Sequence, residues 1–171
     1  MVLERNGVTE MHGKPLTLIG PEIKVGDKAP DFRLLTNDLK TVSLSNYEDK
    51  IKLISVIPSL DTSVCNAQTR RLNEEMNNLS KDVVVLTVSV DLPFAQNRWC
   101  GAANVNNIVT LSDHKDTNFG VSYGVLIKDD RILTRTVFVL DKENVVRHVE
   151  YVSENINHPD YEALLDAVKK I

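Results

Sequence analysis

Two cysteines, Cys65 and Cys100, are the residues of this chain best suited to chemistry. They are its only thiols, and they stand much farther apart than the two intervening residues of a CxxC motif. No histidine lies two to five residues from either of them, so the ligand spacing of a zinc site is absent. Two cysteines are also too few for a disulfide-stapled fold. The remaining possibilities are inert core thiols and thiol redox chemistry.

Cys65 is predicted to lie in the first turn of a helix, because Thr62 and Ser63 just before it are good N-cap residues. Unpaired amides and the helix dipole favour a thiolate there. The dipole contributes ~0.3–1 kcal/mol, whereas a tenfold change in ionisation takes about 1.4 kcal/mol. A reactive Cys65 therefore needs a cation nearby. The alternative is a small apolar residue on the buried face of the helix.

A proline and a threonine precede this cysteine in the pattern Pro58-x-x-x-Thr62-x-x-Cys65. Proline fixes one backbone angle at the entry of the loop and can shape a pocket around the sulfur. A threonine hydroxyl can accept one hydrogen bond and donate another, to the sulfur or to a bound oxygen. The pattern therefore favours a reactive Cys65.

The same pattern is the active-site signature of peroxiredoxins, and the chain resembles the thiol peroxidase subfamily of atypical two-cysteine peroxiredoxins. Two further segments are similar to that subfamily: 91–100, which carries the second cysteine, and 135–141, which begins with an arginine. The N-terminal segment and the segment 159–163 are similar as well. The likeness extends over almost the whole chain.

The resemblance implies a role for five residues. Cys65 would be the peroxidatic nucleophile, Thr62 would hydrogen-bond the thiolate and the peroxide, and Pro58 would line the pocket. Arg135 would be the required cation, although an arginine at a strand end is otherwise expected to be solvated. Cys100 would be the resolving thiol that forms a disulfide with Cys65 in the same chain.

The resemblance also implies the partners of the reaction. Hydrogen peroxide or organic hydroperoxides would be the substrates, thioredoxin the reductant, and a homodimer the assembly. No metal or organic cofactor is implied, and the chain has no Gly-x-Gly-x-x-Gly or phosphate-binding loop for a nucleotide.

Two other functions are compatible with the cysteines. A general thiol–disulfide oxidoreductase of the same fold is disfavoured because the cysteines are not in a CxxC motif. A peroxide sensor without turnover is disfavoured because nucleophile, threonine, arginine and second thiol are all present. Consumption of a reduced thiol partner that depends on peroxide would separate these functions from a peroxidase.

The elements that must position these residues follow an α/β pattern. Residues 51–57 and 83–90 are apolar and rich in β-branched side chains, which is typical of strands buried on both faces. Residues 64–79 between them carry an apolar stripe at helical spacing. A strand, a helix and a strand in this order predict a parallel crossover.

The remaining segments complete a thioredoxin-like fold, a mixed central sheet flanked by helices. We expect an N-terminal β-hairpin within residues 1–20, a helix from Pro93 that ends near Cys100-Gly101, strands at 135–140 and 145–152, and a helix at 159–170. A disulfide requires Cα atoms within about 7 Å. With the two cysteines on separate helices, both regions are expected to unwind when the disulfide forms.

Composition places the chain among ordinary globular proteins. Its 171 residues are 42% hydrophobic and 26% charged, which fits one domain over 1–171. The net charge of −4 gives no basic surface for nucleic acid or anionic membranes. Residues 1–6 show no basic stretch followed by an apolar one, so we expect a cytoplasmic protein.

Overall fold

A seven-stranded sheet forms the centre of the molecule. The computed structural model describes all residues of the chain, 1–171. The strands are β3 (Leu34–Leu35), β4 (Thr41–Val42), β5 (Ile51–Val56), β6 (Val83–Ser89), β7 (Val109–Ser112), β9 (Thr136–Leu140) and β10 (Val146–Tyr151). Their order across the sheet is β10-β9-β5-β6-β7-β3-β4. The three central strands β5, β6 and β7 are parallel, and β9 pairs antiparallel with β5. The predicted mixed sheet and parallel crossover are confirmed.

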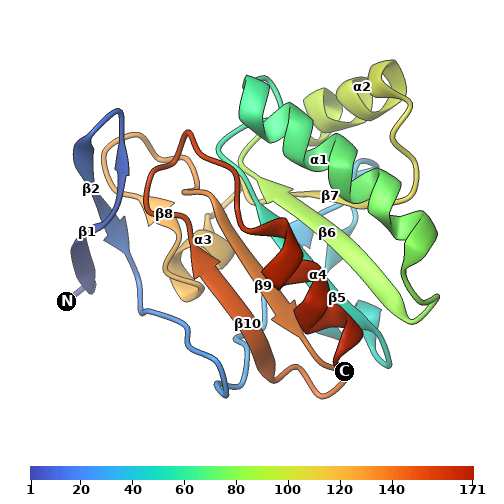
Figure 1. Ribbon diagram of the computed structural model, residues 1–171. Coiled ribbons are helices and arrows are strands. Elements are labelled where there is room, and N and C mark those ends of the chain that lie inside the picture. Colours follow the sequence, from blue (N-terminus) through green and yellow to red (C-terminus); the bar gives the residue numbers. More distant parts are fainter.

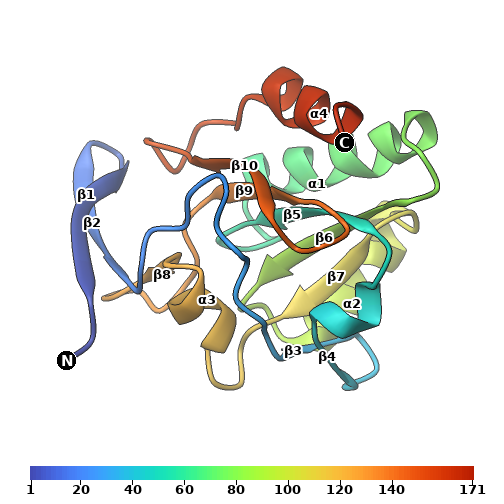
Figure 2. The same cartoon turned by 90° about the horizontal axis from the view of Figure 1, so that it is seen from below.

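Helices cover both faces of this sheet. They are α1 (Ser63–Glu75), α2 (Pro93–Ala103), α3 (Asn118–Ser122) and α4 (Tyr161–Lys169), with short 3-10 turns η1 (Leu44–Tyr47) and η2 (Met76–Asn78). The green α1 and the red α4 lie on one face, as the views of Figures 1 and 2 agree. The opposite face is covered by α3 and the chain that leads into β3 (Figure 2).

The main sheet separates two hydrophobic clusters, because successive side chains of a strand point to opposite faces. On β5, Leu53 packs in a cluster with Leu72 of α1 and Leu164 of α4. The next residue, Ile54, belongs to the cluster on the other face, which contains Phe119 of α3. Successive strand side chains point to opposite faces, and both faces are buried here, so the strand is apolar almost throughout.

An N-terminal hairpin extends the fold at one side. Its strands β1 (Glu4–Met11) and β2 (Lys14–Ile19) form a small sheet with β8 (Leu126–Ile127), separate from the main sheet (Figure 1). His12 and Gly13 form the turn, both with positive φ. The backbone of Glu10 on β1 donates to Ser153 and accepts from Asn155. The hairpin is therefore tied to the segment that follows β10.

Several boundaries differ from the sequence prediction. The helix after Pro93 does not end at Cys100-Gly101; it continues to Ala103 and is closed by Asn104 in the left-handed conformation. Asparagine adopts that conformation more readily than most residues, which moves the cap beyond Gly101. The helix α3 and the strand β8 were not predicted, because elements of five and two residues are too short to show a period.

No helix of the structure combines the length and apolar character required to span a bilayer.

Candidate active site

Cys65 lies at the third position of α1 and is fully buried, directly after the loop that leaves β5. Thr62 is the N-cap residue with extended backbone, as the sequence predicted. The Cys65 side chain packs with Ile57 and Leu60, and Trp99 of α2 covers the cluster. The predicted first-turn placement of Cys65 is confirmed, and the sulfur faces inward.

Arg135 is the residue just before β9, and its side chain extends to the sulfur of Cys65. Its Nη2 lies 3.4 Å from Cys65 Sγ, and its side chain is only 2% exposed. An arginine at a strand end is commonly solvated, but this one is buried beside a thiol. The structure thus brings together the two residues that the family resemblance proposed as nucleophile and cation.

Neutral groups hold the remaining edges of the guanidinium. Gln68 Oε1 accepts from Arg135 Nη1 at 2.8 Å, and the Asn155 carbonyl accepts from Arg135 Nε at 3.0 Å. Asn155 Oδ1 also accepts from the Arg135 backbone N–H at 2.7 Å. Arg135 makes no ion pair with a carboxylate. A buried cation without an anion is costly, so the sulfur is the group beside it that can supply negative charge.

Gln68 and Asn155 were not identified from the sequence. Gln68 is fully buried one turn after Cys65, and its Nε2 donates to Ser55 Oγ on β5 at 2.8 Å. A glutamine three residues from a buried cysteine, on the same face of an amphipathic helix, was the available signal. No sequence signal pointed to Asn155, because it lies in an irregular segment before α4.

The loop before Cys65 is fixed by Asp91, which precedes α2. The Asp91 carboxylate accepts from the Ser59 hydroxyl at 2.7 Å and from the Leu60 backbone N–H at 2.9 Å. Its Oδ2 also accepts from Ser89 Oγ at 2.7 Å. One carboxylate thereby joins the loop of the first cysteine to the segment that carries the second.

Pro58 and Thr62 have different surroundings. Pro58 is buried in the loop that follows β5. Thr62 is exposed, and its hydroxyl donates to the Ser59 carbonyl at 3.0 Å rather than to a group on the helix. The hydroxyl has no hydrogen bond to Cys65 in this conformation.

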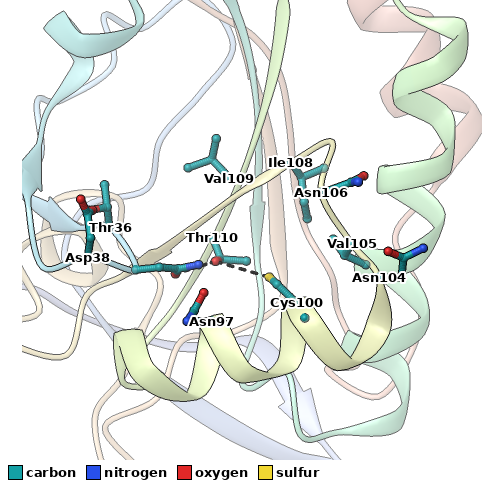
Figure 3. Close-up of a pocket in the computed structure, with 12 residues that line it drawn as sticks. Thr36, Asp38, Asn97, Cys100, Asn104, Val105, Asn106, Ile108, Val109 and Thr110 are labelled. Atoms are coloured by element: carbon teal, nitrogen blue, oxygen red, sulfur yellow. Dashed lines mark hydrogen bonds between the residues drawn. The ribbon is translucent and has the colours of Figure 1, made fainter.

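Cys100 lies on α2, in a different environment from Cys65. Its Sγ is 3.7 Å from Thr110 Oγ1 on β7, and burial raises the pKa of the Cys100 thiol. It lines a pocket of about 500 Å³ between α2, the chain leading into β7 and the turn between β3 and β4 (Figure 3). No disulfide joins the two cysteines, and both thiols are free.

Arg70 and Trp99 connect the two cysteine-bearing helices. The Arg70 guanidinium of α1 lies 5.6 Å from the centre of the Trp99 ring on α2, a cation–π contact. Its Nη1 also donates to the Ala103 carbonyl at the end of α2, at 3.2 Å. Arg70 thus holds the two cysteine-bearing helices against each other.

Comparisons with known proteins agree with this geometry. Residues 24–165 match the model of the Redoxin family. A thiol peroxidase of Halalkalibacterium halodurans is 57% identical over 157 residues, which are 92% of this chain and 94% of that protein. A thiol peroxidase of Bacillus subtilis is 56% identical over 159 residues, 93% of this chain and 95% of that protein.

Solved structures show the same fold. A peroxiredoxin-like protein from Aquifex aeolicus superposes with a TM-score of 0.89 at 39% identity, covering 99% of this chain and 98% of that one. A thiol peroxidase from Chromobacterium violaceum superposes with a TM-score of 0.85 at 22% identity, over 95% of each chain, which shows the fold alone. The fold and the matching structure at 39% identity place the chain in the class of peroxiredoxin-like proteins. The chain belongs to the Redoxin family, and within it to the thiol peroxidases.

Proposed function

We propose that this chain reduces hydroperoxides with Cys65 as the nucleophile and Cys100 as the resolving thiol. The observation that carries the proposal is the 3.4 Å contact between Arg135 Nη2 and Cys65 Sγ, in a site where the guanidinium has no carboxylate partner. The relatives named thiol peroxidase, over most of this chain's length, support the same reaction.

In the first step the Cys65 thiolate attacks one oxygen of the peroxide. The O–O bond breaks, the sulfur is oxidised to a sulfenic acid, and the other oxygen leaves as an alcohol or water after taking a proton. Arg135 favours the thiolate and stabilises the negative charge that develops on the leaving oxygen. Because Gln68 and Asn155 already hold the guanidinium, little reorganisation is needed when the charge develops.

Thr62 is assigned a role in binding the peroxide. Its side chain is exposed at the N-cap of α1, in the turn that precedes the buried Cys65. Rotation of the side chain away from the Ser59 carbonyl frees the hydroxyl to donate to a bound oxygen. Pro58, buried just after β5, is assigned to the wall of the peroxide pocket.

In the second step Cys100 attacks the sulfenic sulfur. A Cys65–Cys100 disulfide forms and the hydroxyl leaves as water after taking the proton of the Cys100 thiol. Cys65 lies in the cluster with Ile57 and Leu60, whereas Cys100 lines a separate pocket, so the last turn of α2 and the first turn of α1 unwind for this step.

We assign thioredoxin as the reductant that returns the disulfide to two thiols. We also propose that the protein acts in the cytoplasm, because two free thiols suit a reducing compartment. A homodimer is proposed from the family resemblance alone.

Peroxide-dependent oxidation of reduced thioredoxin tests the whole cycle. The wild-type protein should turn over many equivalents of peroxide, Cys65→Ser should have no activity, and Cys100→Ser should consume one equivalent and stop at the sulfenic acid. Activity that survives in Cys65→Ser would overturn the assignment of the nucleophile. A single turnover in the wild type, with no recycling by thioredoxin, would favour a peroxide sensor instead.

A further inference from the structure

Neighbouring residues Trp99 and Cys100 face different parts of the molecule. Trp99 packs on the cluster that contains Cys65, whereas Cys100 points into a pocket lined by no residue of α1 or of the loop 58–62. Figure 3 shows the Cys100 sulfur directed toward Thr110 on β7. Successive helical residues are about 100° apart around the axis, so an intact α2 cannot present both side chains to the Cys65 site.

A hydrogen-bonded series of three side chains, Asn37, Thr110 and Cys100, holds the Cys100 thiol in this pocket. Thr110 is buried on β7, with its Oγ1 3.7 Å from Cys100 Sγ, and it donates to Asn37 Oδ1 at 2.9 Å. A threonine hydroxyl has one hydrogen. Because Asn37 takes that hydrogen, the Thr110 oxygen faces the sulfur as an acceptor for the Cys100 S–H. The arrangement therefore suits the protonated thiol in its pocket.

Ionisation of Cys100, or its departure from the pocket, changes the hydrogen bonds of this series. A thiolate in the pocket would require Thr110 to turn its hydrogen toward the sulfur and give up Asn37. Departure of the neutral thiol breaks the contact with Thr110 but leaves the bond to Asn37 intact. The pocket accordingly retains Cys100 as a thiol until α2 releases it.

We propose that Thr110, oriented by Asn37, is a positioning residue that retains Cys100 in its pocket and slows formation of the Cys65–Cys100 disulfide. This inference rests on the proposed function, in which Cys100 resolves the sulfenic acid. Its consequence is a longer lifetime of the sulfenic acid, during which a second peroxide can oxidise Cys65 to the sulfinic acid.

The test follows the reduced protein after rapid mixing with hydrogen peroxide, using fluorescence of its single tryptophan, Trp99. The first phase, whose rate depends on peroxide, reports sulfenic acid formation, and the second reports the disulfide. In Thr110→Val the second phase should be at least about threefold faster, since one hydrogen bond to the thiol is lost. The first phase should change less than twofold. The yield of sulfinic acid, measured by mass spectrometry in excess peroxide, should fall by a similar factor.

Conservative and partner variants separate positioning from damage to the fold. Thr110→Ser keeps the hydroxyl and should restore the wild-type second phase. Asn37→Leu, which leaves Thr110 free to donate to the sulfur, should alter the second phase and have little further effect in combination with Thr110→Val. A second phase that is unchanged or slower in Thr110→Val, or is not restored by Thr110→Ser, would overturn the inference.

Cys100→Ser distinguishes failure of this inference from failure of the proposed function. If the second phase is lost in Cys100→Ser but unaffected by Thr110→Val, the retention of Cys100 is wrong and its resolving role stands. If Cys100→Ser keeps the second phase, Cys100 does not resolve and both proposals fail.

Discussion

The guanidinium of Arg135 lies 3.4 Å from the sulfur of Cys65, and no carboxylate accompanies it. This relationship joins two elements far apart in the chain, the first turn of α1 and the entry to β9. It places the sulfur beside a buried cation whose other partners, Gln68 and Asn155, are neutral.

Arg135→Met should lower the second-order rate constant for peroxide by ~10²-fold or more, because loss of one charge-stabilising donor in an active site has effects of that size. Arg135→Lys keeps the charge but cannot bind Gln68, Asn155 and the sulfur together. Its rate constant should therefore lie between those of the wild type and Arg135→Met. Stopped-flow fluorescence measures both. A wild-type rate in Arg135→Met would exclude the catalytic role.

Gln68→Met keeps the side-chain length but leaves Arg135 Nη1 and Ser55 Oγ without their partner. We expect a loss of ~1–3 kcal/mol in the free energy of unfolding, the cost of unpaired buried polar groups. The peroxide rate should also fall about tenfold, which corresponds to ~1.4 kcal/mol of lost positioning.

Thr69→Val is the matched control for Gln68→Met. Thr69 is buried on the same helix and donates to the Cys65 carbonyl, but has no contact with Arg135. Its substitution should affect unfolding more than the peroxide rate. Equal rates in Gln68→Met and Thr69→Val would show that Gln68 has no special effect on Arg135.

Asp91→Asn replaces one carboxylate oxygen with an amide N–H₂, which cannot accept from the donors that Asp91 now binds. We expect the loop 58–62 to loosen, with faster hydrogen exchange at the Leu60 amide and a peroxide rate several-fold lower. The unfolding free energy should fall by ~1–3 kcal/mol. Unchanged exchange at Leu60 would contradict the anchoring role of Asp91.

Asp113 predicts a pH dependence of stability that is independent of the active site. Burial raises the pKa of Asp113 from 3.8 to about 7, although the amides of Phe119 and Gly120 donate to its carboxylate. Between these values the folded state binds more protons than the unfolded state. Its stabilising contribution is therefore complete below about pH 4 and is lost as the pH rises to about 7.

Chemical unfolding across this pH range measures the effect as the difference between wild type and Asp113→Asn. The advantage of the wild type should shrink as the pH rises. Asp116→Asn is a control without a trend in this range, because the Asn118 side chain lowers the pKa of the exposed Asp116 from 3.8 and its contribution changes only at more acidic pH. A wild-type advantage that is constant with pH would show that Asp113 does not titrate in this range.

The arrangement of the sheet could be predicted from the sequence because its strands are long apolar runs. Residues 51–57 and 83–90 became β5 and β6 almost without change, and the N-cap at Thr62 placed Cys65 correctly. The end of α2 was predicted three residues too early. Gly101 suggested a stop, but the left-handed residue is Asn104.

The placement of Cys65 could be predicted from the residues around it, but its neighbours could not. Arg135 was proposed only through the family resemblance, because its own segment suggests a solvated strand end. Gln68 meets Arg135 only when α1 packs against Ser55 of β5. Asn155 is still less visible, since a loop position shows no period. Contacts between distant segments arise from tertiary packing, which local patterns do not record.

The dependence of Arg135 on Asn155 has a consequence for protein synthesis. A chain still growing on the ribosome carries both cysteines long before Arg135 and Asn155 have been added. Asn155 in turn is bound by Glu10, so the earliest and latest parts of the chain must meet before the guanidinium is seated. Chains that end before Asn155 are therefore expected to hold Cys65 without the seated guanidinium beside it.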